Sequence, residues 1–503
     1  MEILSAEQIR AWDEYTMQHE PIASIDLMER AAASCYLWLE KHGYVGRSFS
    51  IYCGKGNNGG DGLALARMLS DAECPVTVYI LEFGFKGTDD FQVNLARLHP
   101  TPAEVRFIQG ADNFHPVTPG DVVIDALLGS GLNRMLDGVA AALVDHLNAS
   151  GNEIIAVDIP SGLFVSRSSR GNTVIHATHT LSFQCCKPAF LMPENALAVG
   201  AVHILDIGLH PGYLQQVSGE DELLDATIVR AIFRPRPPFA HKGNFGHALL
   251  VAGSFGKMGA AVLGARACLR SGAGLLSVHV PGCGYSILQT AVPEAMVFAD
   301  PDEKIHTDFE GDPSAYSVVG VGPGIGMEGR TVEFLRGLLA GCRKPMVLDA
   351  DALNILASSS DLWGLVPPYS ILTPHPKEFE RLFGPSPDDY ARVDLALEQA
   401  RQRQCIIVLK GHNSYIAMPG GKGYFNSTGN PGMAKGGSGD VLTGILTGLL
   451  SQGYSPGEAA LLGVYLHGLA GDLAAAVWSQ ESMLASDLTD QLGRAFIEIQ
   501  KVS

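Results

Sequence analysis

The stretch STGNPGMAKGGSGDVLTGILTGLL, residues 427–450, joins a glycine-rich segment to an apolar run with the character of a helix. A glycine-rich turn that leads into a helix presents free backbone N–H groups and the positive end of the helix dipole, and such a turn can bind phosphate. Asp440 stands where the turn meets the helix. The simpler alternative is a tight turn in which Asp440 only caps the helix. The dense GGSGD cluster favours a phosphate site with a carboxylate beside it, an arrangement suited to phosphoryl transfer.

Length and composition predict more than one well-packed α/β domain. The chain has 503 residues, whereas single hydrophobic cores stop growing at roughly 250–300 residues. It is 46% hydrophobic and 17% charged, which is typical of a folded chain rather than a disordered one. The net charge of −18 argues against general binding to nucleic acid or to a membrane surface, although a local set of backbone N–H groups can still hold an anion.

The cysteines and the N-terminus predict a cytoplasmic protein. The nine cysteines include no C-x-x-C pair, so we expect reduced thiols rather than disulfides or a zinc site. The first residues, MEILSAEQIRAWDEY, are polar and charged, unlike a signal peptide. No uninterrupted apolar run approaches the roughly 20 residues that a membrane span needs, so we expect no membrane span.

In the first half of the chain, a glycine-rich loop connects a predicted strand to a predicted helix. The strand, residues 48–53, runs into GKGNNGGDG, residues 54–62, and then into the helical LALARMLS. The loop matches neither the dinucleotide fingerprint nor the P-loop. Its asparagines and Asp61 can offer amides and a carboxylate to a ligand. A plain tight turn is the alternative, but five glycines, two asparagines and an aspartate in nine residues are dense for a turn alone.

Two further predicted strands, residues 121–124 and 153–157, end next to the acids Asp125 and Asp158. In an alternating β/α chain these strands are expected to be parallel, with right-handed crossovers. Their carboxyl ends and the GNNGGDG loop then lie at one edge of the sheet, where open α/β sheets bind ligands. The sequence therefore predicts a site at this edge.

The motifs GKGNNGGDG, DALLGSGL and VDIPSG resemble the YjeF N-terminal family, the epimerases of hydrated nicotinamide dinucleotide, over about residues 1–215. The resemblance implies a Rossmann-like three-layer α/β/α domain, placed here at residues 1–220, with Asp158 as the acid/base. It also implies a potassium ion held by Asn58, Asp125 and Ser161, through oxygen ligands. The implied contacts to the dinucleotide, besides Asp158, are Asn57, Asn58, Gly59, Gly60, Asp61, Gly129, Ser130, Gly131, Leu132, Asn133, Arg134 and Met135.

Periodicity is lost between residues 212 and 241, and we expect a linker there, with the domain boundary between residues 220 and 221. Beyond it, predicted strands at 247–253, 275–280, 317–321, 346–349, 371–373 and 406–409 end in glycine or in charged residues. GGKG, residues 420–423, predicts a hairpin turn.

The order of GPGIG, DADAL, TPHPKEFERL, LKGHNS and NPGMAKGGSGDVLTG resembles the ribokinase-like superfamily, and within it the NAD(P)H-hydrate dehydratase branch, over about residues 225–500. The resemblance implies a ribokinase-like α/β/α domain, placed at residues 221–503, with Asp440 as catalytic base. The implied substrate contacts are Ala260, Gly324, His375 and Asp440. The implied nucleotide contacts are Lys410, Gly411, His412, Asn413, Ser414, Gly436, Gly437, Ser438 and Gly439. Lys435 departs from the family pattern, which often has Thr there.

Together the two resemblances imply repair of hydrated NADH and NADPH. One half would interconvert the R and S hydrates, and the other would dehydrate the S form at the expense of ADP, giving AMP and phosphate. Mg²⁺ would accompany the nucleotide, and a homo-oligomer is expected. The expected partners are otherwise small molecules, with no nucleic acid and no membrane.

Two other interpretations stay open at the level of sequence. One is a kinase of a small molecule such as a vitamin alcohol, with a dinucleotide-sensing N-terminal half. The other is a non-catalytic dinucleotide sensor or scaffold in the N-terminal half. A stable phosphorylated product would indicate the kinase, and ligand binding without any change in epimer ratio would indicate the sensor.

Overall fold

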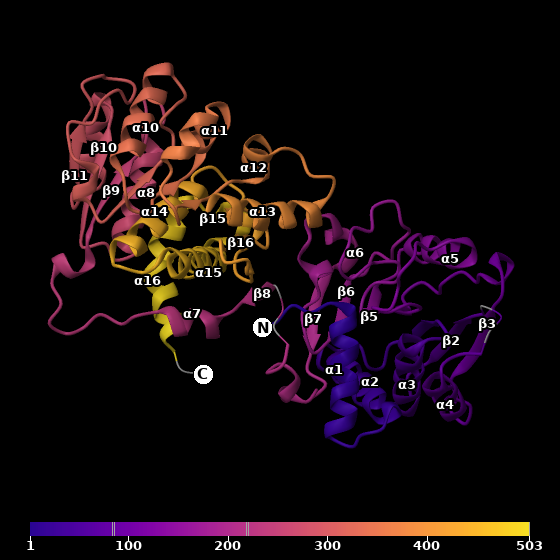
Figure 1. The fold of residues 1–503 in the computed structure, drawn as a ribbon. Helices are drawn as coiled ribbons and strands as arrows, with labels where there is room; N and C mark the ends of the chain where they lie inside the picture. Colours follow the sequence, from indigo (N-terminus) through magenta and orange to yellow (C-terminus); the bar gives the residue numbers. More distant parts are fainter. Residues whose placement is uncertain (83, 85, 218, 220, 502–503) are drawn as a thin grey trace. The chain divides into compact units, whose positions relative to one another are not determined.

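The computed structural model describes residues 1–82, 84, 86–217, 219 and 221–501, which form two compact units (Figure 1). Unit 1 comprises Met1–Gly219 together with the short segment Asp388–Tyr390, and unit 2 comprises the rest of the described chain. All nine cysteines are free thiols.

Unit 1 contains a seven-stranded sheet in the order β3-β2-β1-β4-β5-β6-β7, and every neighbouring pair is parallel. The strands are β1 (Phe49–Cys53), β2 (Val76–Leu81), β3 (Glu104–Ile108), β4 (Val122–Ala126), β5 (Ile154–Val157), β6 (His179–Phe183) and β7 (Ala201–Leu205). The helices are α1 (Ala6–His19), α2 (Ser24–Lys41), α3 (Asn57–Asp71), α4 (Asp89–Leu98), α5 (Gly138–Asn148) and α6 (Ala196–Val199), with short 3₁₀ turns η1 (Ala111–Asn113), η2 (Pro188–Leu191), η3 (Pro193–Asn195) and η4 (Pro211–Tyr213).

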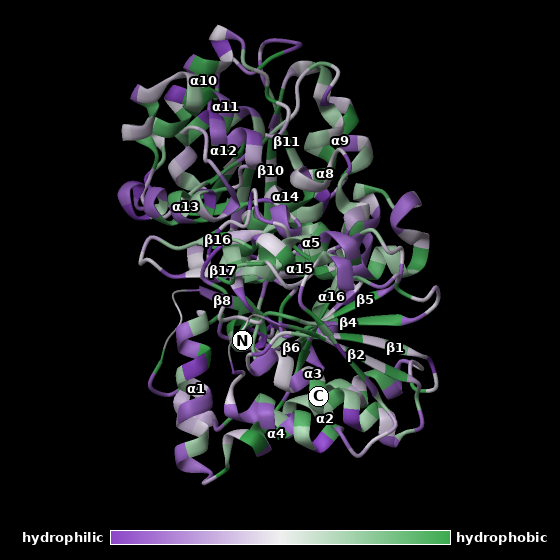
Figure 2. Cartoon of the chain, turned by 90° about the vertical axis from the view of Figure 1, so that its right-hand side faces the viewer, coloured by the Kyte–Doolittle hydropathy of each residue, from purple (hydrophilic) through white to green (hydrophobic). Residues whose placement is uncertain are grey.

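Every residue of the central strands β1, β4 and β5 is buried, whereas the edge strands β3 and β7 are partly exposed. Ile51 packs in a cluster with residues of α2 and α3, whereas its neighbour Tyr52 packs in a second cluster with residues of α5. Figure 2 shows β1, β2, β4 and β5 largely in the colour of hydrophobic residues. Apolar residues on both faces are what a parallel sheet between two helical layers requires. The strand order reverses direction between β1 and β4, which places a crevice at their carboxyl ends.

Unit 2 contains a ten-stranded sheet in the order β11-β10-β9-β12-β13-β14-β15-β16-β17-β8. Its neighbours are parallel except for β15–β16 and β16–β17. The strands are β8 (Asp221–Leu224), β9 (His247–Val251), β10 (Leu275–Val280), β11 (Met296–Ala299), β12 (Val318–Val321), β13 (Val347–Leu348), β14 (Ile371–Leu372), β15 (Ile406–Leu409), β16 (Tyr415–Ala417) and β17 (Gly423–Asn426). The expected hairpin at residues 420–423 is confirmed, since β16 and β17 pair antiparallel around it.

The helices of unit 2 cover this sheet and form its largest apolar cluster with the strands. They are α7 (Ala226–Ile232), α8 (Met258–Arg270), α9 (Tyr285–Ala291), α10 (Gly329–Gly341), α11 (Ala350–Ser358), α12 (Pro376–Phe383), α13 (Asp389–Arg403), α14 (Ser438–Ser451), α15 (Pro456–Ser482) and α16 (Ala485–Gln500). The 3₁₀ turns are η5 (Lys242–Phe245), η6 (Gly282–Gly284), η7 (Pro313–Ala315), η8 (Ser360–Leu365) and η9 (Pro431–Met433). Among the α-helices of unit 2, α14 is the most buried, because Gly444 and Gly448 have no side chains and let it approach α8 closely.

The stretch expected to be an irregular linker contains regular structure. β8 pairs in parallel with β17 at the edge of the sheet, and α7 follows it. Leu224 at the end of β8 is fully buried. A strand of four residues is too short to show periodicity, and its partner lies some two hundred positions later in the chain, so local sequence gives no sign of it.

Among the described residues, α15 is one helix long and apolar enough to cross a membrane by length and composition alone, which differs from the expectation. Within its most apolar window, 61% of the residues are buried inside the unit, as in a core helix of a globular domain.

Candidate active sites

Unit 1 contains a cavity of about 660 Å³ at the carboxyl edge of its sheet. Most of the residues predicted to contact a dinucleotide line it. They are Asn57, Asn58, Asp61, Gly129, Ser130, Gly131, Leu132, Asn133, Arg134 and Asp158. Loops that follow β1, β4 and β5 therefore meet at one place, as parallel strands require.

Gly59, Gly60 and Met135 do not line this cavity. A Cβ atom on Gly59 would lie 1.8 Å from the carbonyl oxygen of Gly54, and one on Gly60 would lie 2.7 Å from Met28 Sδ. These glycines allow α3 to pack closely against its neighbours. The Met135 side chain is exposed.

Asp158 follows β5 and is held in a strained backbone conformation, with φ +70°. Its carboxylate accepts a hydrogen bond from the Ser130 backbone N–H at 2.9 Å and pairs with Lys187 Nζ at 2.9 Å. Lys187 is completely buried and also donates to Ser182 Oγ. Burial acts to raise the pKa of Asp158, but the Lys187 ammonium and the hydrogen bonds outweigh it and hold the pKa below its usual value. Asp158 is therefore ionised.

Of the predicted potassium ligands, Asn58 lines the cavity, whereas Asp125 and Ser161 are fully buried and hydrogen-bonded to each other. Asp125 accepts hydrogen bonds from Ser161 Oγ at 2.6 Å and from the Ser161 N–H at 2.8 Å. Among the described residues, the Asn58 amide is buried and neither its oxygen nor its nitrogen has a hydrogen-bond partner. A Cβ atom on Gly129 would lie 3.1 Å from Asn58 Cβ and 3.0 Å from an Asp158 oxygen, so the amide and the acid are near neighbours.

This oxygen-rich set fits a monovalent cation. An unpartnered buried amide is costly, and a cation bound to its oxygen would remove that cost. Burial raises the pKa of Asp125 to about 6, although three hydrogen bonds oppose the shift. A bound cation would favour the charged carboxylate.

Two more carboxyl groups line the same cavity, Asp13 on α1 and Asp61 on α3. Burial raises the pKa of Asp13 to about 7, and the nearby charge of Asp158 adds to the effect. Burial and Asp158 also raise the pKa of Asp61 well above its usual value. The cavity thus combines one ionised carboxylate with two acids whose pKa values are raised.

In unit 2, the glycine-rich turn begins α14 with its N–H groups unobstructed. The N-cap is Gly437, in the left-handed region at φ +101°, and no side chain among the described residues caps the helix. Asp440 lies in the first turn of α14 rather than at the cap, so the interpretation of Asp440 as a simple N-cap is wrong. His467 is half-buried and donates from Nε2 to the Ser438 carbonyl at 2.9 Å, which fixes the turn.

Asp440 lies among charged groups from other strand ends. Lys410 Nζ pairs with Asp349 Oδ1 at 2.9 Å and lies 3.8 Å from Glu378 Oε2. Thr443 Oγ1 donates to the other Asp349 oxygen at 2.8 Å. Burial and the charge of Asp349 together raise the pKa of Asp440 to about 6, although Lys410 partly opposes both.

The other predicted residues of unit 2 lie on the loops around this centre. His375 is the N-cap of α12, and its Nδ1 accepts from the N–H groups of Lys377 and Glu378 at 3.1 and 3.3 Å. A Cβ atom on Gly324 would lie 3.4 Å from Ala260 Cβ, so these two adjoin. The segment from Lys410 to Ser414 is a turn after β15, and Ser414 Oγ closes it by donating to the Gly411 carbonyl at 3.1 Å. Within it, Gly411 and His412 are exposed and Asn413 is half-buried.

Lys435 points away from the glycine-rich turn before α14. Its Nζ donates to the carbonyl oxygens of Glu481 at 2.5 Å and Met483 at 2.7 Å, at the end of α15. Its geometry is that of an anchor for the turn rather than of a phosphate ligand.

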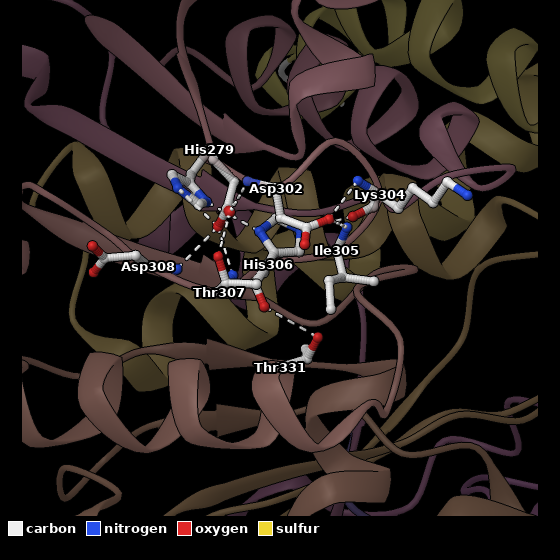
Figure 3. A network of polar contacts seen from close by, with 10 residues as sticks. His279, Asp302, Lys304, Ile305, His306, Thr307, Asp308 and Thr331 are labelled. Atoms are coloured by element: carbon white, nitrogen blue, oxygen red, sulfur yellow. Dashed lines mark hydrogen bonds and ion pairs between the residues drawn. The ribbon is translucent and has the colours of Figure 1, made fainter.

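A buried polar network supports the loop after β9 (Figure 3). His306 Nε2 donates to the Gly253 carbonyl at 2.7 Å, so its Nδ1 accepts from His279 Nδ1 at 3.0 Å. Asp300 accepts from backbone and side-chain donors at Asp302, Thr307 and Asp308. His279, Asp300 and His306 lie close enough together to hold a metal ion. Hydrogen bonds already engage all three side chains, however. The network holds Gly253 beside Ser254, whose Oγ donates to the Gly324 carbonyl at 2.7 Å.

Comparison with known proteins finds a match in each half of the chain. The YjeF-related N-terminus family matches residues 24–189, and the NAD(P)H-hydrate dehydratase family matches residues 248–494. The bifunctional NAD(P)H-hydrate repair enzyme of Moorella thermoacetica is 36% identical over 98% of this chain and 96% of its own length. The chain belongs to the bifunctional NAD(P)H-hydrate repair enzymes. The Escherichia coli member is 33% identical over 93% of this chain and 89% of its own.

Solved structures support the fold of the dehydratase half of this repair enzyme family. A ribokinase-like superfamily protein from Enterococcus faecalis aligns with a TM-score of 0.50 and 29% identity, over 56% of this chain and 96% of its own. The predicted α/β architecture with a ribokinase-like second half is confirmed, and so is the pairing of an epimerase with a dehydratase in one chain. The roles of individual residues stay predictions.

Sequence reasoning missed four charged residues of these two centres of the repair enzyme. Asp349 and Glu378 lie inside the motifs DADAL and PHPKEF. Their position after predicted strands is the signal from which they could have been predicted as site residues. Lys187 and Asp13 lie in no recognisable motif. Only the fold brings them to Asp158.

Proposed function

We propose that this chain restores NADH and NADPH from their hydrates, with epimerisation in residues 1–220 and dehydration in residues 221–503. In the hydrate, a hydroxyl group sits on a ring carbon next to the nicotinamide nitrogen. One observation carries the proposal. Among the residues that the structure describes, no side chain caps the N-terminus of α14, and Asp440 lies in the first turn of the same helix, at the carboxyl edge of the sheet. This arrangement provides a site for a phosphoryl group and a base beside it.

For dehydration, Asp440 accepts the proton of the substrate hydroxyl while the hydroxyl oxygen attacks the terminal phosphoryl group of ADP. The N–H groups from Gly436 to Gly439 stabilise the negative charge of the migrating phosphoryl group. The product is AMP and a phosphorylated hydrate. Phosphate is a much better leaving group than hydroxide, so the lone pair of the ring nitrogen expels it, and loss of a proton from the adjacent carbon restores the dihydronicotinamide.

Lys410 and its acidic neighbours organise the nucleotide side of this centre. The turn from Lys410 to Ser414 follows β15 and is proposed to hold the nucleotide, and Ala260, Gly324 and His375 are proposed to contact the hydrate. Asp349 and Glu378 offer the oxygen ligands that Mg²⁺ prefers, directly or through water. When bound, Mg²⁺ would neutralise charge on the phosphoryl oxygens.

For epimerisation, the proposal places the nicotinamide ring in the cavity of unit 1, beside Asp158. Asp158 is ionised and can act as a base. Asn58, Asp125 and Ser161 are proposed to hold K⁺, which would supply positive charge at this site when bound. Since a base in one position reaches one face of the ring, the dehydratase half accepts one epimer, and the epimerase half supplies it.

We further propose a cytoplasmic homo-oligomer that acts on small molecules. The free cysteines support a reducing compartment. ADP is the proposed donor because the resemblance is to the bacterial branch of the dehydratases.

The test is to incubate mixed hydrated NADH epimers with the full chain and ADP, with ATP, or with neither, and to follow the return of reduced-cofactor absorbance. We expect complete recovery with ADP, release of AMP and phosphate, and no recovery without nucleotide. A stable phosphorylated product and no NADH would instead support the kinase interpretation.

A further inference from the structure

Helix α1 presents Asp13 to the cavity of unit 1 from a firmly anchored position. Trp12, next to it, is buried and donates from Nε1 to the His210 carbonyl at 2.9 Å. One turn later, Thr16 Oγ1 accepts from the His210 N–H at 3.0 Å. These two hydrogen bonds join His210 to Trp12 and Thr16, which lie on either side of Asp13, and they fix this part of the helix. The Asp13 carboxyl group is therefore not a mobile surface acid. It lines the same cavity as Asp158.

Epimerisation of the hydrate needs two groups in opposite protonation states. The bond between the ring carbon and the hydroxyl oxygen must break, with the ring-nitrogen lone pair forming a C=N⁺ bond. The departing oxygen needs a proton to leave as water. A water molecule must then add to the opposite face of that carbon and lose a proton to a base. Asp158, held ionised by Lys187, can be the base but has no proton to donate.

We infer that Asp13 is the proton donor of epimerisation and works together with Asp158; this rests on the proposed function of unit 1. Among the described residues the Asp13 carboxyl makes no hydrogen bond, so it is available to a ligand. The charged groups that face it are Asp61 on α3 and the Asp158–Lys187 pair, while Arg10 and Glu14 flank it on α1.

The surroundings of Asp13 suit a donor better than those of Asp61. A general acid works best when its pKa is near the working pH, and burial with the charge of Asp158 brings the pKa of Asp13 to about 7. Asp61 is shifted well above its usual pKa by burial, and keeps its proton more firmly. Carboxyl groups with pKa values pushed apart in one site are the arrangement expected of an acid and a base.

Protons are conserved over one conversion of the R hydrate to the S hydrate. Asp13 gives its proton to the hydroxyl group, and the C–O bond breaks with release of water. The incoming water gives a proton to Asp158 as the new C–O bond forms. Asp13 has then lost one proton and Asp158 has gained one, and exchange with solvent restores both. The reverse reaction uses the same groups with their roles exchanged.

The experiment measures conversion of the pure R hydrate of NADH to the S hydrate by chromatography, with the full chain and no nucleotide. For Asp13→Asn we expect kcat to fall roughly 10²- to 10⁴-fold, the usual contribution of a general acid, with little change in KM. In the wild type, kcat/KM should fall as the pH rises through about 7, because Asp13 loses its proton; Asp13→Asn should lack this alkaline limb.

Three comparisons make the result decisive. Glu7→Gln removes an exposed acid of the same helix that does not line the cavity, and it should leave the rate and pH profile unchanged. Circular dichroism and thermal unfolding of the full chain report whether unit 1 of each variant is folded. If Asp13→Asn misfolds, Asp13→Glu keeps the carboxyl group and should retain measurable epimerisation with the alkaline limb.

A wild-type chain without epimerase activity would contradict the proposed function itself. With an active wild type, Asp13→Asn at near wild-type rate would overturn the inference, and so would loss of the alkaline limb in Asp61→Asn but not in Asp13→Asn.

Discussion

At the scale of single residues, the two proposed catalytic aspartates occupy opposite environments. Asp158 sits 2.9 Å from a buried lysine, which keeps its pKa low. Asp440 sits near the carboxylate of Asp349, and burial with that charge brings its pKa to about 6. Both residues follow glycine-rich or strand-end motifs in sequence, so their own neighbours in the chain do not explain the difference. The partners that the fold supplies do.

The two aspartates should be separable by substitution. Asp440→Asn removes the base of dehydration and should lower ADP-dependent recovery of NADH from the S hydrate by at least 10²-fold while leaving epimerisation intact. Asp158→Asn should have the reverse effect. Chromatographic assays of both steps on the same samples measure this. Repair of the S hydrate by Asp440→Asn at wild-type rate would show that the base is another group.

Lys187 should matter for both stability and the pH profile of epimerisation. Lys187→Met leaves the Asp158 carboxylate buried without its cation, and breaking a buried ion pair from one side costs about 3–5 kcal/mol. Because the variant also raises the pKa of Asp158, any remaining epimerisation should need a higher pH. Denaturant unfolding and the pH profile of kcat/KM check this. The double variant Lys187→Met with Asp158→Asn removes both charges and should recover part of the stability.

At the scale of elements, the turn before α14 depends on anchors from other helices. His467 of α15 holds the Ser438 carbonyl, and Lys435 reaches the carbonyl groups at the end of α15. Likewise the His279–His306 pair holds the loop after β9 (Figure 3). Contacts to other elements thus hold these glycine-rich loops in place, as a preorganised binding site requires.

Gly437 should tolerate no side chain. Its φ of +101° is unfavourable for alanine, and a Cβ atom would lie 2.7 Å from Leu263 Cδ1. We expect Gly437→Ala to cost about 1–3 kcal/mol of backbone strain and to raise the KM for ADP by distorting the turn, while epimerisation is unaffected. Gly436→Ala is the matched control, since nothing lies within 4 Å of its Cβ position. Equal KM values for the two variants would contradict this view of the turn.

At the scale of the whole molecule, the chain forms two compact units, each with its own sheet and apolar core. The strand order reverses between β1 and β4 in one sheet and between β9 and β12 in the other. Each proposed centre lies at the carboxyl edge of its sheet. Two activities on one chain therefore use the same architectural rule twice.

The two activities should respond to pH in opposite directions. Dehydration needs ionised Asp440, whose pKa is about 6, so its kcat/KM should fall as the pH drops through about 6. Epimerisation, with Asp13 as its acid, should fall as the pH rises through about 7. Repair of a mixed hydrate by the full chain should then be fastest between these values. Parallel pH profiles of the separate steps test this, and profiles that coincide would contradict it.

Much of the architecture could be predicted from local pattern. Alternating apolar strands and glycine loops indicate parallel sheets, because buried parallel strands must be apolar and the chain must turn tightly at their ends. β8 and α7 could not be predicted, since a four-residue strand carries too little periodicity. The predicted residues Asn57 to Asp61 include Gly59 and Gly60, where a Cβ atom would collide with neighbouring atoms, and their contact with a dinucleotide stays a prediction.

The sequence by itself determined the two-domain α/β organisation, the loops that carry chemistry, and the family, because these are written in contiguous motifs. Only the tertiary structure decided how the glycine-rich turn before α14 is built: Gly437 is the N-cap, Asp440 lies inside the helix, and Lys435 is directed to the end of α15. It also decided which aspartates are ionised. Protonation depends on burial and on charges within a few ångströms, and those neighbours, such as Lys187 beside Asp158 and Asp349 near Asp440, come from distant positions in the chain.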